Sequence, residues 1–360
     1  MVRRGFLVVF VIGLALAVSV GPALACGGLI NANGSVTLVR TTTLAAYHRG
    51  IEHYVTSFEF AAGADGEFGS IVPLPGVPTK VVRAGDWTLQ RLVLETQPVA
   101  TDLAFRAAVP AALESANVIL KTKIDALDVV VLEGGGTAVG NWAREHGFLL
   151  PPDAPEVLDF YAERSPIFMA VRYDADRASE QGLATGDGTP VHVVIPTPNP
   201  WVPLRILALG AGPQAPVEAD VFLLTDREPT LLPTPLAPGG RLVRGPVSPG
   251  LVLERSQEAS PTLLTDLRSD KSMKWLPGSD MWLTYLRVDA EAGDLTYDLA
   301  VDASGAGRPS YVAAGLPVPD AGAVDAIRSL RSSGWTALLL VIVILAAATL
   351  ERRRARTPLA

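Results

Sequence analysis

Apolar and polar residues alternate along residues 36–60, and this alternation predicts two strands. Arg49-Gly50 divides the stretch and has the composition of a tight turn. After that turn, one set of alternate positions is rich in aromatic residues, namely Tyr54, Thr56, Phe58 and Phe60. A period of two with aromatic side chains on one side is typical of a strand that covers a core. We therefore expect an antiparallel hairpin over residues 36–60.

Other stretches carry strand or helix patterns of their own. Strands are predicted at 128–133, 167–173, 191–195, 204–209, 219–224, 282–288 and 295–301, the last two as an antiparallel pair. Helices are predicted from Asp86 onward, at about 100–123, and at 139–146, 155–163 and 261–274. Residues 71–78 hold three prolines, so we expect an extended edge or surface segment there. Strands mixed with a few helices, without regular crossovers, predict a β-rich α+β fold with antiparallel sheets.

The two ends of the chain carry the pattern of an exported membrane protein. Residues 1–25 read as a signal peptide, with Arg3 and Arg4 before an uncharged apolar run and small residues before Cys26. Residues 332–350 are an uncharged stretch long enough to span the hydrocarbon core, and an arginine cluster follows it. These signals predict one C-terminal transmembrane helix, an N-terminal domain outside the membrane and a cytoplasmic tail.

The predicted order of segments follows from these patterns. After the signal peptide, residues 26–225 form an exported α+β domain, and residues 226–302 add a Pro/Gly-rich loop, a helix and a strand pair. Residues 303–331 read as a stalk, 332–350 as the transmembrane helix and 351–360 as the basic cytoplasmic tail. The predicted location is the cell membrane, with a single span.

Composition and charge narrow the classes of function. The chain has 360 residues, 49% of them hydrophobic and 19% charged, which excludes a disordered chain. Without the signal peptide, the span and the tail, 24 basic residues stand against 36 acidic ones, a net charge of −12. Such a surface repels phosphate backbones, so we expect no nucleic-acid partner. The single cysteine excludes an internal disulfide framework and a multi-cysteine zinc site.

The predicted hairpin tip is the best candidate for chemistry, because His48, Glu52 and His53 lie within six residues. Two histidines and a carboxylate are a common zinc ligand set. With Arg49-Gly50 as the turn, however, His48 lies opposite Ile51, and His53 lies opposite Ala46 rather than His48. We therefore favour solvated polar residues here over a metal site.

Three further features are candidate sites. Cys26 would be the mature N-terminus, where a free thiol or a lipid anchor is favoured over a nucleophile. Gly134-Gly135-Gly136 follows a predicted strand but lacks the phosphate-loop patterns, so a turn is favoured. Trp201 lies between prolines on a predicted loop, where a large aromatic side chain is often a contact residue.

Several motifs together resemble one bacterial family, the domain of unknown function 2330. They are Ala25-Cys26-Gly27-Gly28, Ile71-Val72-Pro73-Leu74-Pro75, the block from Leu132-Glu133 through Trp142, Gly147-Phe148 and Pro151 to Phe160-Tyr161, and Pro203-Leu204-Arg205. The resemblance covers about residues 25–225. It implies an exported bacterial protein and no particular activity.

The hypothesis that follows is a cell-envelope protein with a non-catalytic binding or interaction domain outside the membrane. We predict no catalytic, cofactor-binding or metal-ligating residues and no cofactor. The predicted partners are the membrane and a protein or cell-wall component. One alternative is an exported hydrolase that uses carboxylate or metal chemistry, and another is a scaffold subunit of a membrane complex.

Overall fold

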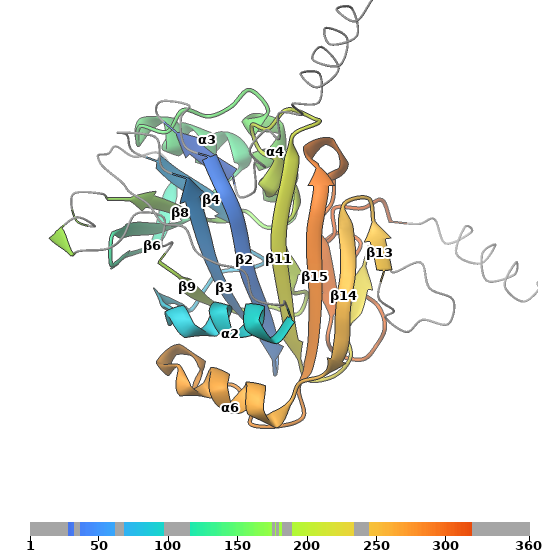
Figure 1. Cartoon of the computed structure of the whole chain (residues 1–360). Coiled ribbons are helices and arrows are strands. Elements are labelled where there is room, and N and C mark those ends of the chain that lie inside the picture. The colour runs from blue at the N-terminus through green and yellow to red at the C-terminus, as the bar shows by residue number, and fades with distance from the viewer. Residues whose placement is uncertain are drawn as a thin grey trace, which may run out of the picture. The chain divides into compact units, whose positions relative to one another are not determined.

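A computed structural model describes residues 28–31, 37–61, 68–96, 116–174, 177, 180–181, 189–233 and 245–318 (Figure 1). Two compact units divide the chain, Met1–Leu316 and Pro317–Ala360, and nearly all described residues belong to the first. The predicted signal peptide, transmembrane helix and tail lie outside the described residues. Within the described ranges, no helix has the length and apolar character needed to cross a membrane.

An eight-stranded sheet forms the centre of the first unit. Across the sheet, its strands are β13 (Gly245–Ser248), β14 (Leu251–Glu258), β15 (Trp282–Glu291), β11 (Pro216–Thr225), β2 (Thr37–His48), β3 (Ile51–Ala61), β9 (Val191–Pro196) and β5 (Lys80–Arg83). β2 and β11 run parallel, and all the other neighbours run antiparallel. β2 and β3 are the predicted hairpin, with bounds within a residue or two of 36–60.

Two smaller sheets complete the strand layers. The five-stranded sheet is antiparallel throughout and consists of β1 (Gly28–Asn31), β4 (Phe68–Pro73), β8 (Ile167–Tyr173), β7 (Leu127–Glu133) and β6 (Asn117–Ile124). The three-stranded sheet consists of β10 (Trp201–Val202), β16 (Leu299–Asp302) and β12 (Thr230–Leu232). The β-rich fold with antiparallel sheets and few helices is the one predicted.

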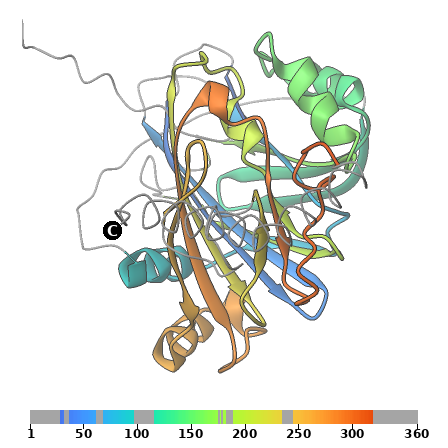
Figure 2. The same ribbon diagram turned by 90° about the vertical axis from the view of Figure 1, so that its right-hand side faces the viewer.

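Helices cover the sheets in two pairs. α2 (Asp86–Thr96) and α6 (Pro261–Ser269) lie side by side across one face of the eight-stranded sheet, as Figures 1 and 2 show. α3 (Gly136–Glu145) and α4 (Ala154–Ala162) pack against each other, away from that face. Single turns of 3₁₀ helix, η1 (Arg205–Ala208), η2 (Lys271–Met273) and η3 (Ala292–Asp294), complete the elements.

Two cores result, one on each face of the eight-stranded sheet. We call the face toward the smaller sheets the inner face; Ala45, Tyr54 and Val193 point from it into the larger core. On the outer face, Leu44 and Val55 pack with residues of α2 and α6 in a second core. The alternation in β3 therefore separates two buried faces, because α2 and α6 cover the face that would otherwise meet solvent.

The prediction that residues 71–78 form an edge or surface segment is wrong at its start. β4 lies between β1 and β8, and Ile71 and Val72 are buried. Pro73 is the last residue of the strand, so the prolines end the ladder without interrupting it.

The helix predicted at about 100–123 is wrong where the structure describes it, because residues 117–124 form β6 and pair with β7. Four of the eight residues of β6 are β-branched, a composition that favours a strand, and β7 supplies the pairing partners. The strand predicted at 204–209 is also wrong. It is the turn η1, whose first amide groups donate to the Asp298 carboxylate.

The predicted pairing of the last two strands is wrong as well. β15 pairs with β11 and β14, and β16 pairs with β10 and β12. The predicted loop at 226–250 contains the short strands β12 and β13. The predicted helix at 261–274 ends at Ser269, because Asp270 caps the turn that follows.

The later part of the chain is built into the same sheets as the earlier part. β15 pairs with β11 over ten residues, from Pro216↔Glu291 to Thr225↔Trp282. Within the stretch assigned to the stalk, Ala313 and Ala314 are buried, and Asp298 donates its main-chain N–H to the carbonyl of Ala314. The first unit accordingly extends to Leu316.

Candidate functional site

The β2–β3 turn has the geometry expected from its sequence. Arg49 and Gly50 have φ angles of 50° and 82°, the left-handed region that a two-residue hairpin turn of this type requires. His48 pairs with Ile51, and Ala46 pairs with His53, so the predicted register is confirmed.

The three candidate polar residues of this hairpin separate in the fold, and the prediction that they are solvated is wrong for Glu52 and His53, which are buried. His48 contacts Asp226, with 2.5 Å between Nδ1 and Oδ1. Glu52 points from the inner face, and His53 points from the outer face, because neighbouring residues of a strand alternate. The described ranges contain no group of three or more His, Cys, Asp or Glu residues arranged to hold a metal ion.

His53 meets a partner that sequence reasoning did not single out. Its Nδ1 atom lies 3.0 Å from Nε2 of His192 on β9, and both imidazoles are buried. The indole of Trp275 stacks on His53 with ring centroids 3.4 Å apart. A histidine within the apolar run of Val191–Pro196 was the only sequence signal for this contact.

Burial keeps both imidazoles neutral. Desolvation, reinforced by His192 and then His48, lowers the pKa of His53 to about 3. Desolvation and then the charge of Lys80 lower the pKa of His192 to about 4, against a smaller opposite effect of Asp270. A general acid or base works best with a pKa near the ambient pH, so these values suit a structural pair better than catalysis.

Two atoms of this cluster lack a hydrogen-bond partner among the described residues. They are Nδ1 of His192 and Nε1 of Trp275, and both are enclosed. One hydrogen bond and one ring stack therefore hold the polar groups of the cluster between β3, β9 and the segment after α6.

Glu52 is the most unusual titratable group on the inner face. It is fully buried, and neither carboxylate oxygen has a hydrogen-bond partner of normal geometry among the described residues. Desolvation raises the pKa of Glu52 from 4.5 to about 8, although the main-chain N–H of Trp201 acts in the opposite direction. The carboxyl group is therefore mostly protonated at pH 7.

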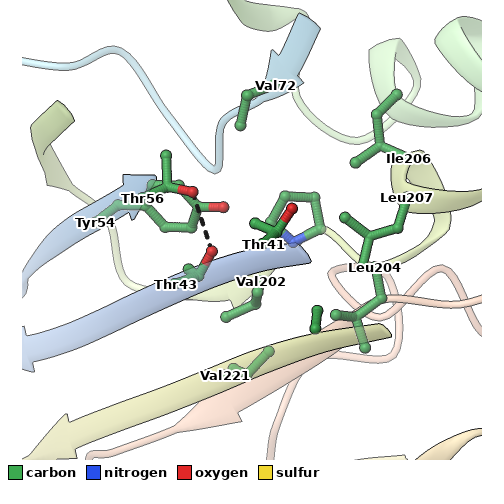
Figure 3. Close-up of a pocket in the computed structure, with 12 residues that line it drawn as sticks. Thr41, Thr43, Tyr54, Thr56, Val72, Val202, Leu204, Ile206, Leu207 and Val221 are labelled. Carbon is green, nitrogen blue, oxygen red and sulfur yellow. Dashed lines mark hydrogen bonds between the residues drawn. The ribbon is translucent and has the colours of Figure 1, made fainter. Parts of the chain in front are cut away.

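A small cavity lies next to β2 and β3 on the inner face (Figure 3). Its volume is about 20 Å³, enough for roughly one water molecule. Thr41, Thr43, Tyr54 and Thr56 line one side, and the hydroxyls of Thr43 and Thr56 lie 3.1 Å apart. Aliphatic side chains from Val72, Val202 and the η1 region close the other side. The cavity has no room for an organic substrate.

A buried ion pair anchors the segment that closes this cavity. The Asp298 carboxylate accepts hydrogen bonds from Tyr161 Oη at 2.8 Å, Arg164 Nη2 at 2.6 Å and the main-chain N–H groups of Leu204 and Arg205 at 2.7 and 3.0 Å. Asp298 is fully buried, and the Arg164 side chain is 7% exposed. Three segments distant in sequence, 161–164, 204–205 and the one that carries Asp298, therefore meet at one carboxylate.

Trp201 does not lie on an exposed loop, so that prediction is wrong. Its side chain is 3% exposed, and its ring stacks on Tyr161 with centroids 5.8 Å apart. The Arg164 guanidinium lies 5.2 Å from the centre of the Trp201 ring, within cation–π range. The flanking prolines place Trp201 in a short strand against the core, where its main role is packing.

The triple glycine connects β7 to α3, as a turn would. A Cβ on Gly136 would lie 2.3 Å from Oδ1 of Asp159 and 2.5 Å from its main-chain nitrogen, so the glycine allows α3 and α4 to approach closely. Cys26 lies outside the described residues.

Comparison with known proteins supports the family resemblance. The sequence model of the family described as "Uncharacterized protein conserved in bacteria (DUF2330)" matches residues 20–228. No curated protein matches the chain. Among solved structures, the chain is similar to baculovirus P35, with a TM-score of 0.40 and 11% identity over 76% of this chain and 99% of that one. It is also similar to a mutated baculovirus P35 after caspase cleavage, with a TM-score of 0.37 and 9% identity over 73% of this chain and 99% of that one.

Proposed function

We propose that this chain, which belongs to the DUF2330 family of uncharacterized proteins conserved in bacteria, is a cell-envelope protein whose exported domain binds a protein or cell-wall component without catalysing a reaction. The observation that carries the proposal is the enclosure of the reactive groups. His53, His192 and Glu52 all point into packed cores, and the cavity on the inner face accommodates only about one water molecule. Groups placed this way stabilise a scaffold and cannot meet a substrate directly.

The envelope location rests on the sequence. A charged and apolar N-terminal signal and an apolar 19-residue stretch followed by arginines support an intervening domain outside the membrane. The acidic net charge of that domain favours a protein or glycan partner over an anionic polymer.

Helix α2 offers the best contact surface for a protein partner. Its buried side consists of Thr88, Leu89 and Leu92. Trp87 and Leu94, seven residues apart and so on one side of the helix, remain 42% and 50% exposed. Exposed tryptophan is enriched among the residues that dominate protein interfaces.

Photo-crosslinking in the native host tests this proposal. A photoreactive amino acid replaces Trp87 or Leu94 in the full chain, and the matched control replaces Leu149, which is 63% exposed in the α3–α4 connection. We expect a defined protein or glycan adduct from positions 87 and 94 and none from 149. Hydrolysis of ester, peptide or glycoside substrates that is lost in Glu52→Gln or His192→Gln, without loss of folding, would contradict the proposal and favour an exported hydrolase.

A further inference from the structure

A short segment on the inner face of the central sheet brings the Trp201 main chain close to the carboxyl group of Glu52. We call residues 197–203 the strap; it runs from the end of β9 through β10. The strap is held by Thr197, whose N–H donates to the carbonyl of Gly50 at 3.1 Å and whose own carbonyl accepts from Tyr47 Oη at 3.0 Å. At its other end, Trp201 and Val202 pair with β16.

The carboxyl group beneath the strap lacks the contacts that stabilise a buried charge. Buried polar groups are almost always hydrogen-bonded, so an exception calls for an explanation. Neither oxygen of Glu52 has such a bond among the described residues, although the Trp201 main chain is close. A protonated carboxyl group tolerates this environment far better than a carboxylate does.

Two tyrosines and three carboxylates are the titratable groups linked electrostatically to this region. Tyr47 on β2 and Tyr54 on β3 interact with it electrostatically, and further carboxylates act on these two tyrosines. Those carboxylates are Asp226 after β11, Asp298 before β16 and Asp302 at the end of β16. The pKa of Glu52 itself is raised by desolvation, against the opposite effect of the Trp201 main chain.

The packing under the strap leaves room for movement. Val202 and Pro203 of the strap border the 20 Å³ cavity, opposite the threonine hydroxyls of β2 and β3 (Figure 3). Side chains beside a void have fewer contacts to lose when the backbone shifts.

We propose that Glu52 is a proton-operated latch: the strap stays closed on the sheet while the carboxyl group carries a proton, and it lifts when the carboxyl group ionises. The closed state raises the pKa of Glu52 from 4.5 to about 8, so opening releases one proton between these pH values. A group with a raised pKa in the closed state favours that state at low pH and loses the effect as pH rises through about 8. Opening therefore increases by up to about tenfold for each pH unit, or roughly 50-fold from pH 6 to pH 8.

Hydrogen exchange of the full chain in mild detergent tests the latch. Exchange of the Trp201 and Val202 amides is followed at pH 6, 7 and 8, with times scaled for the intrinsic pH dependence of exchange. We expect protection of these amides to fall by roughly 50-fold over that range in the wild type and to stay constant in Glu52→Gln. Amides of β7 and β8, in the five-stranded sheet, are the reference and should stay more protected than the strap amides at every pH, because the strap opens without unfolding of the domain.

Two outcomes would overturn the proposal. One is an equal loss of strap protection with pH in wild type and Glu52→Gln, which would remove Glu52 as the cause. The other is equal protection of the strap amides and the β7 and β8 amides in the wild type at each pH, which would show that the whole domain opens and not the strap alone. If Glu52→Gln does not fold, Glu52→Met has a similar size, carries no titratable group and serves the same comparison.

Discussion

Replacing Asp298 by Asn should destabilise the domain more than any change in its exposed ion pairs. The substitution keeps the shape of the side chain and removes its charge. Arg164, whose side chain is 7% exposed, then lacks the carboxylate that lies 2.6 Å away. Asp298 now accepts four hydrogen bonds. The NH₂ group of an asparagine can only donate, so it would point its N–H groups at donors of the surrounding protein.

The expected magnitude follows from the burial of both partners. Removing one member of a buried ion pair costs about 3–5 kcal/mol, because the other charge stays buried without compensation. The exposed pair between Glu156 and Arg205 provides a matched control, since the Glu156 side chain is 76% exposed. Glu156→Gln should lower the free energy of unfolding by less than about 1 kcal/mol.

Urea denaturation of the full chain in detergent, followed by circular dichroism at pH 7, measures both effects. A third variant, Asp298→Asn with Arg164→Met, removes the uncompensated charge and should lose less stability than the two single changes added together. A loss below about 1 kcal/mol for Asp298→Asn, or strict additivity in the double variant, would refute this account.

Two further changes have defined outcomes. Burial lowers the pKa values of His53 and His192 to about 3 and about 4, so the free energy of unfolding should fall by a few kcal/mol as the pH drops from 6.5 toward 4. His192→Gln should reduce that fall in acid denaturation curves. A curve that is unchanged in this variant would contradict the buried pair. Gly69→Ala should destabilise the domain by about 1–3 kcal/mol in thermal unfolding, because the new Cβ would lie 2.1 Å from the Phe148 ring. Gly135→Ala is the control and should change the stability little, because open space surrounds that position. Equal effects of the two substitutions would argue against this packing.

Local pattern predicted the elements whose signals are contained within a few residues. The β2–β3 hairpin has its predicted turn and register, because the alternation and the Arg49-Gly50 turn act over short distances. α2 begins at Asp86 as predicted, with Leu89 and Leu92 on its buried side. β8 has the predicted bounds of residues 167–173.

Failures occurred where a distant segment overrides the local signal. Residues 117–124 contain four β-branched residues, and β7 supplies their pairing partners, so the predicted helix extends too far toward the C-terminus. Residues 204–209 look like a strand by composition. The Asp298 carboxylate, more than 90 residues away, instead accepts hydrogen bonds from the main-chain N–H groups of Leu204 and Arg205, where the turn η1 begins. The prolines within residues 71–78 predict an edge or surface segment, but the ladder of β4 already ends at the first of them, Pro73.

The sequence by itself determined the family, the short-range elements and the register that places Glu52 and His53 on opposite faces of one strand. Only the tertiary structure decided what each of these residues meets. His53 finds His192 across 139 positions, and Glu52 lies beneath the Trp201 main chain. The physical reason is that periodicity reports which face a side chain occupies, whereas the order of strands, set by long-range pairing and burial, decides which side chains share that face.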